Sequence, residues 1–382
     1  MGIPEDELTP RVAQQLLEKV AEDDYRASAK SLQVMSNTIS AATTGRVLLK
    51  MGTLLQTELF GPEAALRAAE QASRNIVSLL LLSSDGSRYR TNEADRRKSA
   101  AARKQEAVTG QDELDVEALT ATERDRGWRE NKIGIVARAL PGGYDAKGHY
   151  MPPEELVKTY VATVLDIHVF GRLFRTEAER RGLEEAAVVV WVGDHGHGNP
   201  TMLEREFASL KKPLNIITDF YHSSERLAEC AKIIEGDGAA SKRKRQKRYY
   251  QLRSWLWDGK IKKVIEKLRS AAEALAPRPS ALSALDNQPS AHTLWLHVFY
   301  FEKHQATMDY PTYRANGWPM GSGTIESSCG QFGERVKHNR MRWTRAGADA
   351  LHAVKAAILS QDERWSRRWP PPVPVLELPA AA

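Results

Sequence analysis

The chain has 382 residues, of which 42% are hydrophobic and 27% are charged, and its formal net charge is +6. This composition is typical of a globular protein with two or three structural units. No apolar run approaches the roughly 20 residues of a membrane-spanning helix. Two cysteines, Cys230 and Cys329, are too few for a disulfide framework or a cysteine-rich zinc module. The N-terminus lacks a basic segment followed by an apolar one, so we expect no signal peptide and a cytoplasmic location.

The first 72 residues predict a small helical domain. Apolar residues recur at helical spacing from Pro10 to about Leu59, and Ser36 or Ser40 is suited to cap the later helix. Two helices across a tight polar turn fit a DNA-binding helix-turn-helix, but they fit a plain helical hairpin equally well. The sequence leaves both interpretations open.

The next segment, "NIVSLLLLSSDGSRYR", predicts a buried strand that ends at a turn formed by Asp85 and Gly86, followed by an outgoing strand. Residues 91–127 nearly lack aromatic and bulky apolar side chains, so we expect a long exposed connection there. The segment "GWRENKIGIVARAL" then returns to strand character.

The middle of the chain alternates between helix and strand patterns. Residues 152–183 predict a helix that a proline opens and Gly182 closes. The segment "AAVVVWVGD" is the clearest strand, because its β-branched run is typical of a central strand buried on both faces. A helix over 201–210 and a strand over 214–222 follow.

Residues 225–316 are helical in pattern and rich in tryptophan and tyrosine. Trp255, Trp257 and Trp295 there could stack on unpaired bases, although we favour a place in the core. Residues 317–369 then contain a glycine-rich turn, a helix that carries Glu326, and a basic C-terminal region. Residues 370–382 form a proline-rich tail.

Basic residues concentrate in two stretches, 241–253 and 334–345, where they alternate with tyrosine or tryptophan. Either stretch could be a solvated helix face or a contact for the phosphates of a nucleic acid. The candidate DNA-binding residues are Lys242, Arg243, Lys244, Arg245, Lys247, Arg248, Arg335, Lys337, Arg340, Arg342 and Trp343.

Six short motifs in this order carry a resemblance to a known family: "SSDGSR", "GWRENKIG", "VVWVGD", "DFYHSSERL", "MGSGTIESS" and "RVKHNRMRWTRAGADAL". From Leu8 to Trp369 the chain resembles the DDE transposases of bacterial insertion sequences, most closely the Kra-type group related to Mutator-like transposases. The resemblance implies an RNase H-like α/β core with a mixed sheet, a large all-helical insertion before the last core helix, and a small helical N-terminal domain.

The resemblance also implies catalytic residues, which are Asp85, Asp194 and Glu326. These three would hold Mg²⁺ or Mn²⁺, since carboxylate oxygens suit hard divalent cations, and two such cations can assist an in-line phosphoryl displacement. The implied activity is metal-dependent strand cleavage and strand transfer at the ends of an insertion sequence. The implied partners are the terminal repeats, the target DNA and further copies of the chain assembled on DNA.

The turn "DHGHGNP" departs from the family pattern and opens an alternative. His195 and His197 could bind zinc together with Asp194 in a metallo-hydrolase, or they could contact DNA or solvent. Asp219 and His222 match an acid-x-x-His element of the family and are candidates for positioning the metal ligands or DNA. A third possibility is a catalytically inactive, DNA-binding derivative.

The helix that carries Glu326 has a patterned face. Glu326, Gly330, Gly333, Lys337 and Arg340 fall on one stripe at helical spacing. The two glycines would let the backbone approach a sheet or DNA, or they would simply fit a crowded packing face.

Overall fold

A computed structural model of the chain describes residues 8–31, 41–60, 77–92, 127–196, 198–337 and 341–369. The candidate residues His197 and Arg340 and the candidate caps Ser36 and Ser40 lie outside these ranges, as does the tail 370–382. Only the two ends of the expected connection 91–127 are described.

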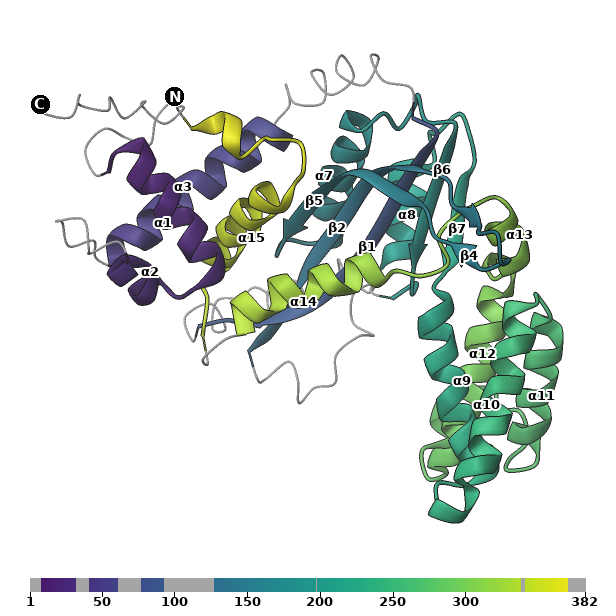
Figure 1. Cartoon of the computed structure of the whole chain (residues 1–382). Helices are drawn as coiled ribbons and strands as arrows, with labels where there is room; N and C mark the ends of the chain where they lie inside the picture. The colour runs from purple at the N-terminus through teal and green to yellow at the C-terminus, as the bar shows by residue number, and fades with distance from the viewer. Residues whose placement is uncertain are drawn as a thin grey trace, which may run out of the picture.

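The centre of the molecule is a five-stranded mixed sheet (Figure 1). Its strands are β1 (Leu79–Arg90), β2 (Trp128–Leu140), β5 (Glu154–Thr163), β6 (Val188–Gly193) and β7 (Leu214–Thr218). Their order across the sheet is β5-β2-β1-β6-β7. Strand β2 runs antiparallel to β1 and β5, whereas β1, β6 and β7 are mutually parallel. The predicted α/β class with a mixed sheet is therefore confirmed.

Helices cover both faces of this sheet, which explains why its central strands are apolar throughout. Helices α7 (Ile167–Arg180) and α8 (Asn199–Phe207) enclose one core with Leu80, Leu82 and Trp191. On the other face, α14 (Gly323–Lys337) lies along β1 (Figure 1) and shares a second core with Leu79 and Leu81. The alternation of neighbouring leucines between the two cores follows from the two-residue period of a strand.

Two predictions about strands are wrong in their extent. Strand β1 does not turn at Asp85 and Gly86 but continues to Arg90, because β2 pairs with it along its whole length, with Asp85 opposite Ile133. Residues 154–163, expected to be helical, form β5, which pairs with the other edge of β2. The predicted helix begins only with α7 and ends as expected at Gly182, whose φ is +92°.

The two ends of the described chain share one core. Helices α1 (Pro10–Glu22), α2 (Tyr25–Ser31) and α3 (Ala41–Phe60) pack around α15 (Arg345–Leu359), as the purple and yellow ribbons of Figure 1 show. The closest approach is at Gly52 of α3, where an added Cβ would lie 2.4 Å from the Cα of Ala350. Helix α15 also packs against β5 and so connects this core to the sheet.

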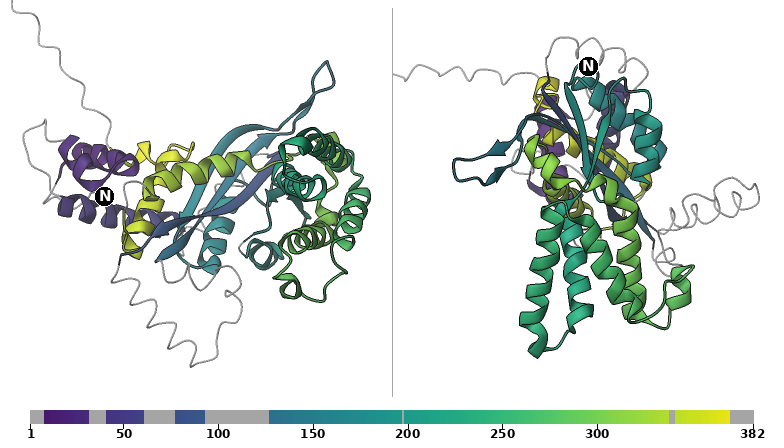
Figure 2. Two further views of the ribbon diagram at one scale, coloured as in Figure 1. Left: turned by 90° about the horizontal axis from the view of Figure 1, so that it is seen from below. Right: turned by 90° about the vertical axis from the view of Figure 1, so that its right-hand side faces the viewer.

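Residues between β7 and α14 form a helical bundle that extends away from the sheet (Figures 1 and 2). Its helices are α9 (Phe220–Glu235), α10 (Lys242–Trp257), α11 (Ile261–Glu273), α12 (Pro289–His304) and the short α13 (Tyr310–Ala315). Trp295 is fully buried and its Nε1 donates to the carbonyl of Ala276 at 3.1 Å. The core interpretation is thus confirmed for Trp295, and Trp255 and Trp257 pack partly buried against the same core. No helix in the described ranges is both long enough and apolar enough to cross a membrane.

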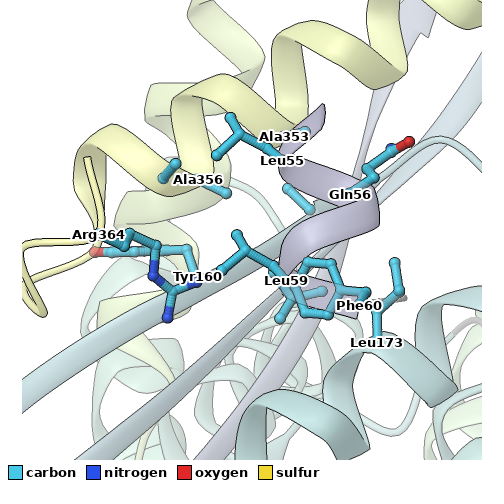
Figure 3. A pocket seen from close by; sticks show the side chains of 12 residues that line it. Leu55, Gln56, Leu59, Phe60, Tyr160, Leu173, Ala353, Ala356 and Arg364 are labelled. Carbon is cyan, nitrogen blue, oxygen red and sulfur yellow. The ribbon is translucent and has the colours of Figure 1, made fainter. Parts of the chain in front are cut away.

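An apolar crevice lies where α3, α15, β5 and α7 meet (Figure 3). Leu55, Leu59 and Phe60 of α3 line one side, Tyr160 of β5 lies opposite, and Arg364 reaches it from the C-terminal segment. At this crevice the terminal helices α3 and α15 do not pack completely against β5 and α7.

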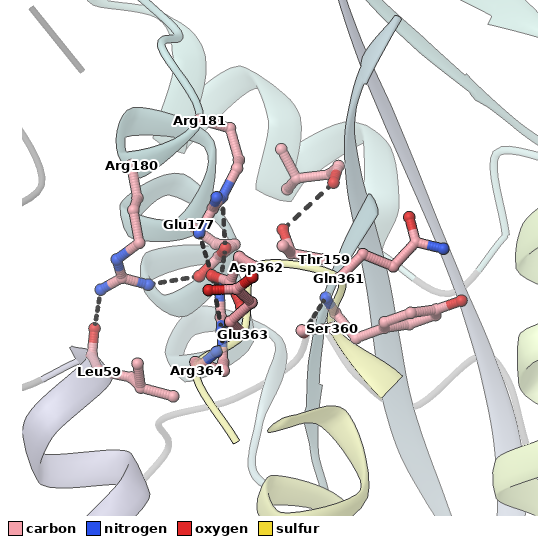
Figure 4. A network of polar contacts seen from close by, with 12 residues as sticks. Leu59, Thr159, Glu177, Arg180, Arg181, Ser360, Gln361, Asp362, Glu363 and Arg364 are labelled. Carbon is pink, nitrogen blue, oxygen red and sulfur yellow. Dashed lines mark hydrogen bonds and ion pairs between the residues drawn. The ribbon is translucent and has the colours of Figure 1, made fainter. Parts of the chain in front are cut away.

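A buried charge network beside this crevice fixes the C-terminal segment to α7 (Figure 4). The fully buried Glu177 pairs with Arg180, with Arg181 Nε at 3.1 Å and with Arg364 Nη2 at 2.5 Å. Burial alone would raise the pKa of Glu177, but the three guanidinium groups hold this pKa well below its usual range. Asp362 balances the excess positive charge by pairing with Arg181 and Arg364.

Candidate functional site

Asp85 and Asp194 lie at matching distances beyond the paired part of two neighbouring parallel strands, β1 and β6. Leu82 of β1 is opposite Trp191 of β6, and each aspartate lies three residues further along its strand (85 − 82 and 194 − 191). Strand β6 ends at Gly193, so Asp194 begins the following loop, whereas Asp85 remains in β1 and pairs only with β2. Both aspartates therefore lie at the same end of the central strands, the end where β6 stops.

Helix α14 brings Glu326 towards this end of the strands. One turn after Glu326, the thiol of Cys329 donates a hydrogen bond to Asp85, and burial together with that carboxylate raises the pKa of the thiol. One turn further, an added Cβ on Gly333 would lie 3.6 Å from Ser87 Oγ of β1. The helix thus follows β1, with Glu326 at its first turn.

The glycines of the predicted stripe are not required by packing. An added Cβ on Gly330 would meet nothing within 4 Å, and one on Gly333 would make only ordinary contacts. The explanation that these glycines fit a crowded face is therefore wrong. Gly330 is exposed beside the Glu326 turn and leaves space there.

Asp219 joins the helical bundle to α14. Its buried carboxylate caps α9 by accepting from the backbone N–H of His222 at 2.9 Å. Its other oxygen accepts from the backbone N–H of Ser322 at 2.5 Å and from the Ser322 hydroxyl. The same hydroxyl lies 3.1 Å from Glu326 Oε1, so one serine connects the two carboxylates. Burial and then the charge of Asp219 raise the pKa of Glu326.

His222, in the first turn of α9, faces Asp194. Its Nε2 is 3.9 Å from Asp194 Oδ2 and 3.5 Å from Arg226 Nη2. The Arg226 guanidinium lies over the ring of Tyr300 at 4.0 Å from the centroid. Two elements of the bundle, α9 and α12, therefore face the loop that begins at Asp194.

His195 connects this loop to the bundle. Its φ is +62°, a left-handed conformation unusual for a residue with a side chain. Its Nε2 hydrogen-bonds with Thr218 Oγ1 at 2.8 Å, and its ring stacks on His304 with centroids 4.3 Å apart. Burial lowers the pKa of both imidazoles, that of His304 to about 4, so both rings are neutral near pH 7. His304 and Thr218 have no local signal in the sequence, because only the fold brings them to His195.

The three predicted ligands do not form a ready-made metal cluster. Among the described residues, no three His, Cys, Asp or Glu side chains gather closely enough to hold a metal ion. Asp85 is hydrogen-bonded to Cys329, Asp194 accepts from the backbone N–H of Gly196 and faces His222, and Glu326 is hydrogen-bonded to Ser322. The donor chemistry fits a hard divalent cation, but the three side chains would have to come closer together to share one.

The basic residues of α10 divide into two groups. Lys242, Arg243, Lys244 and Lys247 are exposed, and they lie near the end of the bundle farthest from the sheet (Figure 1). Arg245 and Arg248 instead stabilise the α9–α10 connection; their contacts are to the carbonyls of Gly236 and Gly238 and to Glu235. The first group is free to contact a polyanion, whereas the second has a structural role.

Two predicted DNA-binding residues near the C-terminus lie in the interior. Arg335 is 3% exposed, donates from Nε to the carbonyl of Val20, and lies 4.8 Å over the ring of Trp343. Trp343 is also buried and donates from Nε1 to the carbonyl of Val336. Both predictions are corrected: these side chains fix α1 to α14 and do not reach the surface. Lys337 and Arg342 are exposed.

Comparison with known proteins adds no relative to this description. No protein-family model matches the chain, and a search of curated proteins finds no match.

Proposed function

We propose that the chain is a DDE-type DNA transposase that cuts and joins DNA strands at the ends of an insertion sequence. The strand order β5-β2-β1-β6-β7, with β2 antiparallel and a helical insertion before α14, agrees with the RNase H-like core that the resemblance implies. The observation that carries the proposal is the matched placement of Asp85 in β1 and Asp194 directly after β6, with the helix of Glu326 along β1.

In this proposal Asp85, Asp194 and Glu326 hold Mg²⁺ or Mn²⁺. The cation would stabilise the entering and departing oxygens of a phosphoryl displacement. To hold the cation, Glu326 would give up its hydrogen bond with Ser322, and its raised pKa would make it a weaker ligand in acid. Asp219 and His222 position the ligands by holding the start of α14 and facing Asp194.

Exposed cations supply the sequence-independent part of DNA binding. Lys242, Arg243, Lys244 and Lys247 of α10, with Lys337 and Arg342, would neutralise phosphates of the terminal repeat or the target. Each such contact makes the affinity fall with salt concentration. The resemblance further suggests that several copies assemble on the DNA in the bacterial cytoplasm.

Cleavage and joining of a labelled element-end duplex in the presence of Mg²⁺ or Mn²⁺ tests the proposal. Glu326→Gln removes the charge with little change of shape, and it should abolish both reactions. Glu334→Gln is the matched control, since Glu334 is an exposed glutamate on the same helix. Full activity of Glu326→Gln would contradict the proposal. If every variant and the native chain bind DNA in a salt-dependent way without cutting it, the chain is the inactive derivative.

The alternative metallo-hydrolase on a small substrate has weaker support. His195 already uses Nε2 for Thr218 and its ring for His304. That alternative predicts an activity lost in His195→Ala and unchanged in Glu326→Gln, the reverse of the transposase pattern.

A further inference from the structure

Three tyrosines lie near the chain that leads into α14: the exposed Tyr144 and Tyr221, and the partly buried Tyr150. Tyr144 and Tyr150 lie on a two-stranded projection made of β3 (Gly143–Tyr144) and β4 (Tyr150–Met151), which extends from the sheet in Figure 2. Their ring centroids are 6.2 Å apart in an edge-to-face arrangement. Tyr144 is 54% exposed, and Tyr221 of α9 is 56% exposed. These are high values for large aromatic side chains, and they mark a surface rather than a core.

Hydrogen bonds join the projection to the segment that precedes α14. The backbone N–H of Gly142 donates to the carbonyl of Gly317 at 2.8 Å, and the hydroxyl of Tyr150 donates to the carbonyl of Trp318. Gly317 has a φ of +67°, and an added Cβ there would lie 2.4 Å from the carbonyl oxygen of Gly142. The tyrosines are therefore held against the chain that leads into α14.

Tyr221 lies directly beside the candidate active site. It follows Asp219 by two residues, and its ring covers Gly321, where an added Cβ would lie 2.3 Å from Tyr221 Cδ2. Gly321 precedes Ser322, which contacts Glu326. The ring thus rests on backbone at the entry to α14, and a large part of it remains open to solvent.

Tyr150 contacts the ring of Tyr144 and lies near Tyr221. Burial and then the nearby hydroxyls of Tyr221 and Tyr144 raise its pKa to about 12, while Arg314 opposes them. Arg314 also donates from Nε to the hydroxyl of Tyr144 at 3.3 Å. Arg314 is itself buried, so the surface consists of the tyrosine ring faces and hydroxyl groups, which suit bases better than aliphatic side chains.

We propose that Tyr221, Tyr150 and Tyr144, here called the tyrosine strip, bind unpaired nucleotides next to the cleaved bond by stacking on their bases. This proposal rests on the proposed function, because it assumes that the DNA bond to be cut lies at Glu326. Aromatic faces accept any base, so the strip would hold a separated strand without reading its sequence.

Fluorescence of 2-aminopurine tests the strip with the full chain and without added metal. The probe is an element-end duplex with a short unpaired tail that carries the 2-aminopurine, and the reference is the same duplex without a tail. Native protein and Tyr221→Phe should quench the probe, because both retain an aromatic ring. Tyr221→Leu and Tyr144→Leu should each weaken binding of the tailed duplex about tenfold and leave the blunt duplex unchanged.

Tyr250→Leu is the matched control, since Tyr250 is 55% exposed but lies on α10 of the bundle. Equal quenching by native protein, Tyr221→Leu and Tyr144→Leu would overturn the proposal. So would a loss in Tyr250→Leu as large as that in Tyr221→Leu. The exposed Leu140, Met151 and Leu156 nearby could instead favour a second copy of the chain. Sedimentation distinguishes the two occupants. If Tyr221→Leu dissociates a dimer into monomers and leaves quenching unchanged, the surface binds a second copy of the chain and the proposal of base stacking is refuted.

The two proposals fail in different ways. Glu326→Gln should quench the probe as the native chain does, because stacking needs no catalytic carboxylate. Quenching that depends on Tyr221, in a chain that never cuts DNA, would retain the strip and reject the transposase activity. Cleavage that depends on Glu326, with no difference among the tyrosine variants, would retain the transposase activity and reject the strip.

Discussion

Asp219→Asn should loosen the first turn of α14 without unfolding the protein. The native carboxylate accepts from the N–H of His222 through one oxygen and from the N–H and hydroxyl of Ser322 through the other. An asparagine has one accepting oxygen, so in either orientation its NH₂ group faces an N–H donor. A buried donor left without an acceptor costs about 1–3 kcal/mol, and loss of the α9 cap costs about 1 kcal/mol.

Native-state hydrogen exchange measures this loosening directly. The amides of Ile325 and Glu326 donate to the carbonyl of Ser322 and so report the first turn of α14. Their exchange should become about five- to a hundredfold faster in Asp219→Asn. Strand cleavage should fall, while salt-dependent DNA binding stays unchanged. Ser322→Ala is the milder control, because it removes the hydroxyl and keeps the N–H bond. Unchanged exchange and unchanged cleavage in Asp219→Asn would refute the positioning role of this carboxylate.

Three further predictions concern stability and are read from urea unfolding. Gly52→Ala should destabilise the protein despite the higher helix propensity of alanine, because its Cβ would meet Ala350; Gly45→Ala in the same helix has room and should stabilise it by up to about 1 kcal/mol. Glu177→Gln should cost about 3–5 kcal/mol, since it leaves buried guanidinium groups without their anion, and a cost below about 1 kcal/mol would contradict this. His352 is fully buried, and burial lowers its pKa from 6.5 to about 4. The unfolded chain therefore binds the proton first, so stability should fall by on the order of 3 kcal/mol as pH drops from 6.5 to 4. His352→Gln should make that part of the profile less steep, with the remaining slope due in part to His304, whose pKa is also about 4, and an equally steep profile would show that His352 is not responsible.

The sequence was sufficient to predict a helix or strand where the pattern of that one segment decides its structure. The β-branched run of β6 and the glycine that ends α7 were both predicted at the correct places. Residues 154–163 were assigned to a helix, because their apolar residues fit either period and only the edge of β2 makes them a strand. The Asp85–Gly86 pair has the chemistry of a turn, but a full-length partner keeps it extended.

The sequence pointed to the carboxylates of the candidate site but not to the residues that contact them. Asp85 and Asp194 were expected together because each follows an apolar strand run, and the two strands are neighbours and parallel, although β1 continues beyond Asp85. Ser322 and His304 act through contacts with Asp219 and His195, which are distant in sequence and have no shared pattern. Arg335 was expected on the surface, because composition reveals charge but does not show that α1 covers it.

The chain enters and leaves the helical bundle at the same end of the bundle. The backbone N–H of Phe220 donates to the carbonyl of Met320 at 2.8 Å, so the chain leaves and returns at the same point, beside the carboxylate of Asp219. The exposed lysines of α10 lie near the opposite end of the bundle (Figure 1). The bundle therefore joins a positively charged far end to the segment next to the first turn of α14. If the proposed function holds, DNA bound at the far end would act through the bundle on the segment that carries Glu326.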